Sequence, residues 1–395
     1  MRNLSITVIL AGISFLSPST ASALEFSQAW KACYNMAADF GDYEIGACTQ
    51  IITSGRLNAV NLSAAFGNRG LGYANKKEYD KALADYARAI SLNGKNFKNF
   101  ANRAYTYRML KRYDESLADL NRSVKINPKY AYAHDSLGNL YAEMQKYPEA
   151  VASYDKALEL QPGNAYYWAN RGWVYLRQWN DTFRTIEDRI EAVAKGGPIK
   201  ADTDQAFSDF AEALKLKPDH IGALNGTCFA NILRKLYVPA AEACGKSIAV
   251  NRNNSYPWQW RAYAYHRQGN FTQAISDADE ALKLAPASDS IWNLRGNAYK
   301  ARGQAGDSAK AIEDYTQSLK LDPKSAIVYR NRANTYLQMK NYPAAIGDFT
   351  SALEPSPDYL EALTDRARAY SLMGDTEKAE ADAIAAAKLR EKQAL

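Results

Sequence analysis

The side chains that most often perform chemistry are few in this sequence and widely spaced. The three histidines lie far apart along the chain, at His134, His220 and His266. Metal binding and acid–base catalysis need such groups clustered in one place, so this spacing predicts neither a metal site nor a cofactor. Glycines at positions 67, 70 and 72 resemble part of a phosphate-binding loop, but their order does not match G-x-G-x-x-G. We therefore expect that the protein is not an enzyme.

The first 23 residues have the features of a secretory signal peptide. Arg2 precedes an apolar stretch over residues 4–16, and Ala21 and Ala23 supply the small side chains that a signal peptidase requires. The apolar stretch is too short to span a bilayer, and no later stretch is long enough. We expect cleavage before Leu24, no stable membrane insertion, and export to the periplasm or beyond the cell. An uncleaved anchor is the alternative.

Export would place the four cysteines in an oxidising compartment, where they can form disulfides. Three pairings are possible. We favour Cys33 with Cys48 and Cys228 with Cys244, because the members of each pair are 15 or 16 residues apart. That is the distance from one helix to the facing helix of a hairpin. The alternative is four buried thiols.

The composition is that of a globular protein. Of the 395 residues, 47% are hydrophobic and 23% are charged, and the net charge is +6. This apolar content is enough for a core and excludes a disordered or low-complexity chain. The positive excess is too small, over so long a chain, to predict nucleic-acid binding.

Prolines recur with a period that divides most of the chain into repeats. Pro128 and Pro162 are 34 residues apart, as are Pro323 and Pro357. With these prolines at position 32 of a repeat, residues 63–393 form nine units. The units are 63–96, 97–130, 131–164, 165–220, 221–254, 255–288, 289–325, 326–359 and 360–393.

The units share a pattern of large and small side chains. Position 11 is tyrosine in eight of the nine units, and position 8 is small in all of them. Small residues also recur at positions 20 and 27, where they let two helices approach closely. A polar or glycine-containing turn lies between the two segments of each unit, and no strand-like alternation competes. Each unit is therefore predicted to be a helical hairpin.

The pattern resembles the tetratricopeptide repeat, whose signature is matched by Trp168, Gly172, Tyr175, Ala206, Phe210, Ala213 and Pro218. This resemblance implies an all-α fold, a right-handed α-solenoid of about nine helical hairpins. It also implies a concave face, lined by the first helix of each hairpin, that holds a segment of a partner protein. Residues 24–62 look like a shortened, degenerate hairpin that would cap the N-terminal end.

An arginine at position 7 and an aspartate at position 23 occur together. Seven units have both residues, and the two units without the arginine also lack the aspartate. Because a half-buried charge without a partner is costly, we expect each arginine to pair with the aspartate of its own hairpin. The alternative is a row of cationic sites for an anionic ligand.

Unit 165–220 contains an insertion at about residues 181–202. Its apolar residues have helical spacing, at Phe183, Ile186, Ile190 and Val193. We expect this stripe to pack on the protein's own surface. The alternative is a helix that docks another chain.

By analogy with the family, aromatic residues of the first helices would line the concave face. They are Tyr105, Trp173, Phe229 and Tyr263 at position 9, with Tyr132, Tyr166 and Tyr256 at position 2. The basic residues near them are Arg108, Arg177, His266 and Arg267. The expected ligand is an extended peptide with apolar anchors and some acidic character. The alternative is that these rings only pack between neighbouring repeats.

The sequence thus predicts a non-enzymatic scaffold that binds another protein or a peptide segment, without nucleic acid. Two further hypotheses use the same surface. The rings could bind envelope glycan, or the protein could be an accessory subunit that positions a separate enzyme.

Overall fold

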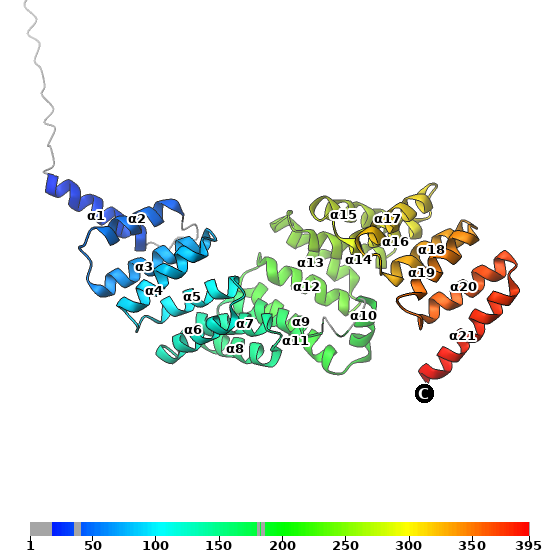
Figure 1. The fold of residues 1–395 in the computed structure, drawn as a ribbon, viewed down its shortest axis with the longest axis horizontal. Helices are drawn as coiled ribbons and strands as arrows, with labels where there is room; N and C mark the ends of the chain where they lie inside the picture. Colours follow the sequence, from blue (N-terminus) through cyan, green and yellow to red (C-terminus); the bar gives the residue numbers. More distant parts are fainter. Residues whose placement is uncertain (1–17, 35–40, 180–181, 183–185, 395) are drawn as a thin grey trace, which may run out of the picture. The chain divides into compact units, whose positions relative to one another are not determined.

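The structure is a computed structural model that describes residues 18–34, 41–179, 182 and 186–394. Within these ranges the regular elements are 21 α-helices, and there is no β-strand (Figure 1). The helices form two compact units, divided after Pro162. No helix in the described ranges is both long and apolar enough to cross a membrane. The expected all-α solenoid of helical hairpins is confirmed.

The first compact unit consists of four successive pairs of helices. Its helices are α1 (Pro18–Tyr34), α2 (Asp42–Thr53), α3 (Ala59–Asn75), α4 (Tyr79–Leu92), α5 (Phe97–Met109), α6 (Tyr113–Ile126), α7 (Ala131–Glu143) and α8 (Tyr147–Leu160). The predicted disulfide between Cys33 and Cys48 joins α1 to α2. The repeat that was expected to begin at Ser63 has a longer first helix, because the side chain of Asn58 caps α3 four residues earlier.

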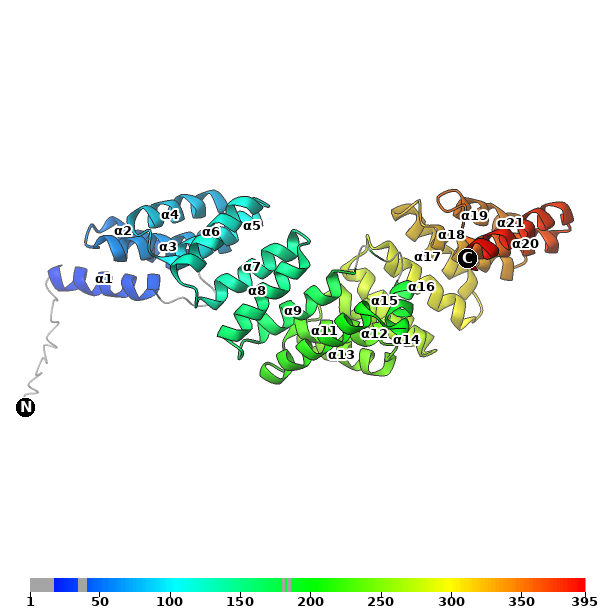
Figure 2. The ribbon, with the colours of Figure 1, turned by 90° about the horizontal axis from the view of Figure 1, so that it is seen from below.

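The second compact unit, which begins with α9 (Figure 2), contains six pairs of helices and one inserted helix, α10, which is labelled in Figure 1. Its helices are α9 (Ala165–Arg177), α10 (Ile186–Lys195), α11 (Pro198–Leu216), α12 (Ile221–Leu233), α13 (Tyr237–Val250), α14 (Ser255–Arg267), α15 (Phe271–Leu284), α16 (Asp289–Arg302), α17 (Asp307–Leu321), α18 (Ala326–Gln338), α19 (Tyr342–Leu353), α20 (Leu360–Met373) and α21 (Thr376–Ala394). Helix α9 pairs with α11, and α10 lies between them in sequence. Helix α11 begins at Pro198, inside the range expected for the insertion, because proline is well suited to the first turn of a helix.

A glycine of the first helix faces an aromatic ring of the second helix in four hairpins. The pairs are Gly70 with Tyr86, Gly138 with Tyr154, Gly172 with Phe210, and Gly296 with Tyr315. A Cβ atom on any of these glycines would lie only 2.7–3.0 Å from the ring. In the α12–α13 hairpin the equivalent positions are Cys228 and Cys244, and the predicted disulfide joins them. A covalent bond therefore stands where other hairpins have a ring packed on a glycine.

The turn inside eight of the nine repeats uses a left-handed backbone conformation. Residue 15 of the repeat has a positive φ at Lys77, Lys111, Gln145, Lys235, Gly269, Gly303, Lys340 and Gly374. In the α18–α19 turn, the next residue, Asn341, donates its backbone N–H to the carbonyl of Tyr336 at 2.9 Å. This hydrogen bond ends the first helix and reverses the chain. Lysine and glutamine are strained in this conformation, whereas glycine is not.

We expect Lys340→Gly to stabilise the protein by about 0.5–1 kcal/mol, because glycine removes the strain at φ 60°. The measurement is the urea midpoint of unfolding. Gly269→Ala, which introduces the same strain in the α14–α15 turn, should lower the midpoint by a similar amount. If Lys340→Gly lowers the midpoint, the lysine side chain contributes more than the strain costs.

Candidate functional site

The seven repeated arginines pair with the aspartates of their own hairpins, as predicted. In each pair, Nε and Nη2 of the arginine donate to the two carboxylate oxygens at 2.6–2.8 Å. The pairs are Arg69–Asp85, Arg103–Asp119, Arg171–Asp209, Arg261–Asp277, Arg295–Asp314, Arg332–Asp348 and Arg366–Asp382. Both nitrogens of this bidentate contact are occupied, so these arginines serve the fold rather than a ligand.

Several of these arginines also link one hairpin to the preceding one. The remaining nitrogen, Nη1, of Arg332 donates to the hydroxyl of Thr316 in the preceding hairpin at 2.9 Å. Arg366 makes the same contact with Thr350 at 3.0 Å. Each such guanidinium therefore holds its own hairpin together and fixes the stacking of its neighbour. The sequence pattern predicted the first role and missed the second.

The expected groove residues of the first compact unit lie near one another but pair locally. The guanidinium of Arg108 lies 5.4 Å from the ring centre of Tyr105 and forms an ion pair with Glu143. Tyr132 is half-buried, and its ring lies 5.8 Å from that of Tyr130. These contacts are typical of packing between neighbouring helices.

In the second compact unit, three rings from three first helices form a stack. The ring of Trp173 in α9 lies 6.4 Å from that of Phe229 in α12, and the two planes differ by 17°. Trp260 in α14, which the sequence analysis did not single out, lies 5.1 Å from Phe229 and 6.2 Å from Trp173. The exposed ring of Tyr256 extends this stack from α14, 5.7 Å from Trp260.

The expected residues Tyr166 and Arg177 are not part of this stack. Tyr166, at the start of α9, is exposed and contacts the ring of His220 and the ammonium of Lys217. Arg177 is exposed at the last turn of α9.

A cavity of about 300 Å³ adjoins the stack. It is enclosed by α10, α12, α14 and α16, and its lining residues are Ile186, Glu187, Phe229, Ile232, Gln259, Trp260, Tyr263, His266, Arg267, Ser290, Asn293, Leu294 and Asn297. The cavity brings together Phe229, Tyr263 and Arg267, three of the residues expected at the groove. It is large enough for one amino-acid side chain and its backbone.

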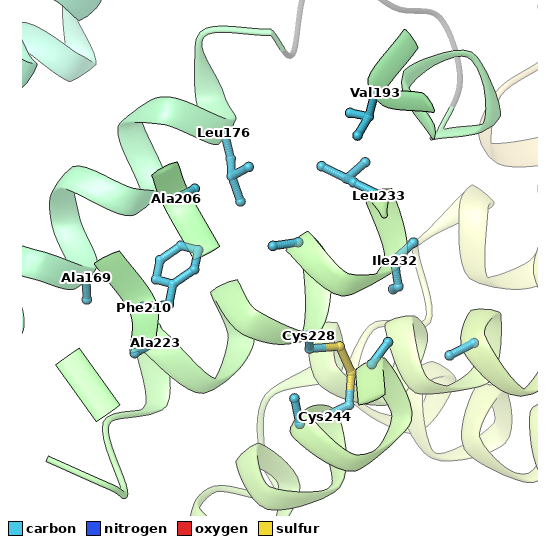
Figure 3. Close-up of a cluster of buried hydrophobic side chains, with 14 of the residues drawn as sticks. Ala169, Leu176, Val193, Ala206, Phe210, Ala223, Cys228, Ile232, Leu233 and Cys244 are labelled. Atoms are coloured by element: carbon cyan, nitrogen blue, oxygen red, sulfur yellow. A yellow bond between two sulfur atoms is a disulfide. The ribbon is translucent and has the colours of Figure 1, made fainter. Parts of the chain in front are cut away.

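The inserted helix α10 forms one wall of this cavity. Ile190 and Val193 of α10 are buried in a core cluster with Leu176 and Leu233 (Figure 3). The expectation that the insertion packs on the protein's own surface is confirmed for this part of the stripe; Phe183 lies outside the described residues. The preceding turn of α10 directs Ile186 and Glu187 to the cavity.

The wall formed by α16 offers hydrogen-bond donors. The Oδ1 atom of Asn293 accepts a hydrogen bond from Asn331 at 3.0 Å, and Oδ1 of Asn297 accepts one from the hydroxyl of Tyr315 at 2.8 Å. The two amide NH2 groups have no hydrogen-bond partner among the described residues, so they are available to a ligand. The ligand group at this wall must therefore be an acceptor, such as a carbonyl or carboxylate oxygen.

The titratable groups of the cavity are held in defined states. The hydroxyl of Tyr263 donates to Glu187 at 3.1 Å, and burial together with that carboxylate raises the pKa of Tyr263. Burial and the nearby Arg267 lower the pKa of His266. At neutral pH the tyrosine is therefore protonated and the histidine is neutral.

No group of three or more histidine, cysteine, aspartate or glutamate residues in the described part of the chain has the arrangement of a metal site. Among the lining residues of the cavity, the hydroxyl of Ser290 is hydrogen-bonded by the amide of Gln259 and not by a general base. The rings of Phe229 and Trp260 and the amides of Asn293 and Asn297 make the cavity suited to binding a ligand.

Comparison with known proteins gives a single family. Models described as tetratricopeptide repeat match residues 63–96, 255–288, 300–359 and 360–393, and a model described as TPR repeat matches residues 104–145 and 138–178. No curated protein matches the sequence.

Several solved structures are similar to parts of the chain. PilF of Pseudomonas aeruginosa has 17% identity and a TM-score of 0.49, over 63% of this chain and 99% of its own. The APC/C hetero-tetramer Cut9–Hcn1 has 13% identity and a TM-score of 0.49, over 93% of this chain and 85% of its own. YrrB, described as a TPR protein with an unusual peptide-binding site, has 17% identity and a TM-score of 0.41, over 54% of this chain and 97% of its own.

Proposed function

Because this chain belongs to the tetratricopeptide-repeat family, whose members typically act as scaffolds for other proteins, we propose that it binds an extended segment of a partner protein and performs no catalysis. An apolar side chain of the segment enters the cavity between α10, α12, α14 and α16. The observation that carries this proposal is the combination of an aromatic floor, at Phe229 and Trp260, with the amide donors of Asn293 and Asn297.

The aromatic floor of the cavity and the amide groups of α16 would contribute to binding in different ways. Burying an apolar side chain against the rings supplies most of the affinity. The amide NH2 groups bind backbone carbonyls of the segment and hold it extended along α16. The exposed guanidinium of Arg267 lies at the rim, where a charge mainly sets orientation and the rate of association.

A peptide fits this site better than an envelope glycan does. Sugars stack on an uncovered ring face, whereas the rings of Trp173, Phe229 and Trp260 lie against one another. Glycan binding is therefore the weaker proposal. The experiment below tests it with purified envelope glycan.

The test is selection from a displayed random peptide library, followed by affinity measurements on the selected peptides. Ser290 is exposed at the rim of the cavity, so Ser290→Trp should fill the cavity without removing a packed side chain. We expect binding to weaken at least about tenfold. Ser276→Trp adds the same bulk to an exposed position of α15 and should leave binding unchanged.

Both variants must keep the helical circular dichroism and the unfolding midpoint of the wild type. Peptides that bind both variants equally, or purified envelope glycan that binds in their place, would contradict the proposal.

We further propose that the protein is exported and begins at Leu24 after cleavage. The leader-like composition of residues 1–23 and the two disulfides support this proposal. Intact mass spectrometry of the native protein should give the chain without residues 1–23, and alkylation without reductant should add no label. A retained Met1, or four labelled cysteines, would contradict it.

A further inference from the structure

A second group of polar side chains continues from the cavity along α16. Asn293, Asn297 and Lys300 lie at intervals of four and three residues, which places them on one face of the helix. The two asparagines line the cavity, and Lys300 lies beyond it. From Asn293 to Lys300 the helix advances about 10 Å.

The next two hairpins contribute an arginine and an aspartate whose charges both act on Lys300. Nε of Arg330 in α18 donates to Oδ2 of Asp365 in α20 at 2.8 Å, and Nδ2 of Asn334 donates to the same oxygen at 3.2 Å. The side chains of Arg330 and Asp365 are only 30% and 22% exposed. Burial and the charge of Arg330 lower the pKa of Lys300. The group thus contains two cations and one carboxylate.

The lysine is the member of this group that makes no direct ion pair among the described residues, although the charge of Asp365 favours its protonated form. Arg330 and Asn334 both bind the carboxylate of Asp365, whereas no ion pair or hydrogen bond of the Lys300 ammonium occurs among the described residues. A half-buried cation next to a second cation is stabilised by any anion that reaches it. Lys300, Arg330 and Asp365 together carry one net positive charge, which one carboxylate of a ligand would neutralise.

We infer that Lys300 forms an anion-binding subsite for an acidic side chain of the partner segment, a few residues from the side chain in the cavity. This inference rests on the proposed function, because it assumes that the segment lies along α16. An extended peptide advances about 3.3 Å per residue, so the 10 Å between the two subsites corresponds to about three residues. The recognised segment therefore has an apolar anchor and an aspartate or glutamate three residues before or after it.

The test uses synthetic peptides with one apolar anchor and either aspartate or asparagine three residues away, on either side. The wild type should bind one of the aspartate peptides about tenfold more tightly than its asparagine counterpart. Lys300→Met keeps the aliphatic stem but removes the charge, and it should abolish this difference. Lys320→Met removes one charge from an exposed position of α17 and should retain it.

The outcomes separate this inference from the proposed function. If Ser290→Trp blocks all peptides but the wild type binds aspartate and asparagine peptides equally, the subsite is wrong and the proposed function stands. If no anchored peptide binds the wild type, the proposed function is wrong.

A second measurement tests the Lys300 subsite without depending on peptide binding. The Lys300 amine is acylated in the presence of N-acetylaspartate or N-acetylasparagine, and the modified peptide is quantified by mass spectrometry. Protection by the aspartate compound alone supports an anion site at Lys300. Equal labelling with both compounds would overturn it.

Discussion

Gly226→Ala is expected to destabilise the second compact unit by about 3 kcal/mol, at the upper end of the usual cost of overpacking a core. Gly226 of α12 faces the ring of Phe210 in α11, and an added Cβ would lie 2.2–2.4 Å from three ring carbons. The ring cannot move away, because Phe210 is fully buried and its other neighbour is Gly172, where a Cβ would be 2.7 Å away. The measurement is the urea midpoint of unfolding, at unchanged m-value.

The matched control is Gly347→Ala in α19. This glycine is exposed, and a Cβ there meets no atom within 4 Å. Alanine favours the helix, so the control should stabilise the protein by up to about 1 kcal/mol. Combining Gly226→Ala with Phe210→Leu should cost less than the sum of the two single changes, because the smaller side chain makes room. An additive result would show that the ring contact is not the cause.

Asp348→Ala is the second change with a large expected effect, a loss of about 3 kcal/mol. It leaves the guanidinium of Arg332 without the carboxylate that accepts two of its hydrogen bonds at 2.7 and 2.8 Å. The Arg332 side chain is only 17% exposed, so water replaces the lost partner poorly. These hydrogen bonds raise the pKa of Arg332, and the substitution removes them. The arginine still remains charged at neutral pH, because the ordinary pKa of a guanidinium lies far above 7.

A double-mutant cycle separates the pair from its surroundings. Arg332→Met with Asp348→Ala should destabilise less than the sum of the single variants, because the double variant buries no isolated charge. A coupling energy near zero would contradict the pairing. Arg332→Met should also remove the hydrogen bond to Thr316, so the stacking on the preceding hairpin is expected to loosen in that variant.

The hairpins and their internal pairs could be predicted from the sequence because both partners lie within one repeat. Arg332 and Asp348 are 16 residues apart, as are Cys228 and Cys244. A helix, a short turn and a second helix bring such residues together whatever the rest of the chain does. Nine copies of the same pattern made these predictions strong.

The cavity, in contrast, depends on contacts between repeats. Tyr263 meets Glu187 across 76 residues of sequence, and Asn331 meets Asn293 across 38. Trp260 joins the ring stack from repeat position 6, where the shared pattern has no aromatic residue to draw attention to it. The sequence by itself determined the family, the hairpins and the pairs that hold them. Only the tertiary structure decided which side chains share the cavity, because neighbouring first helices and the inserted helix α10 meet through packing that no spacing within a repeat encodes.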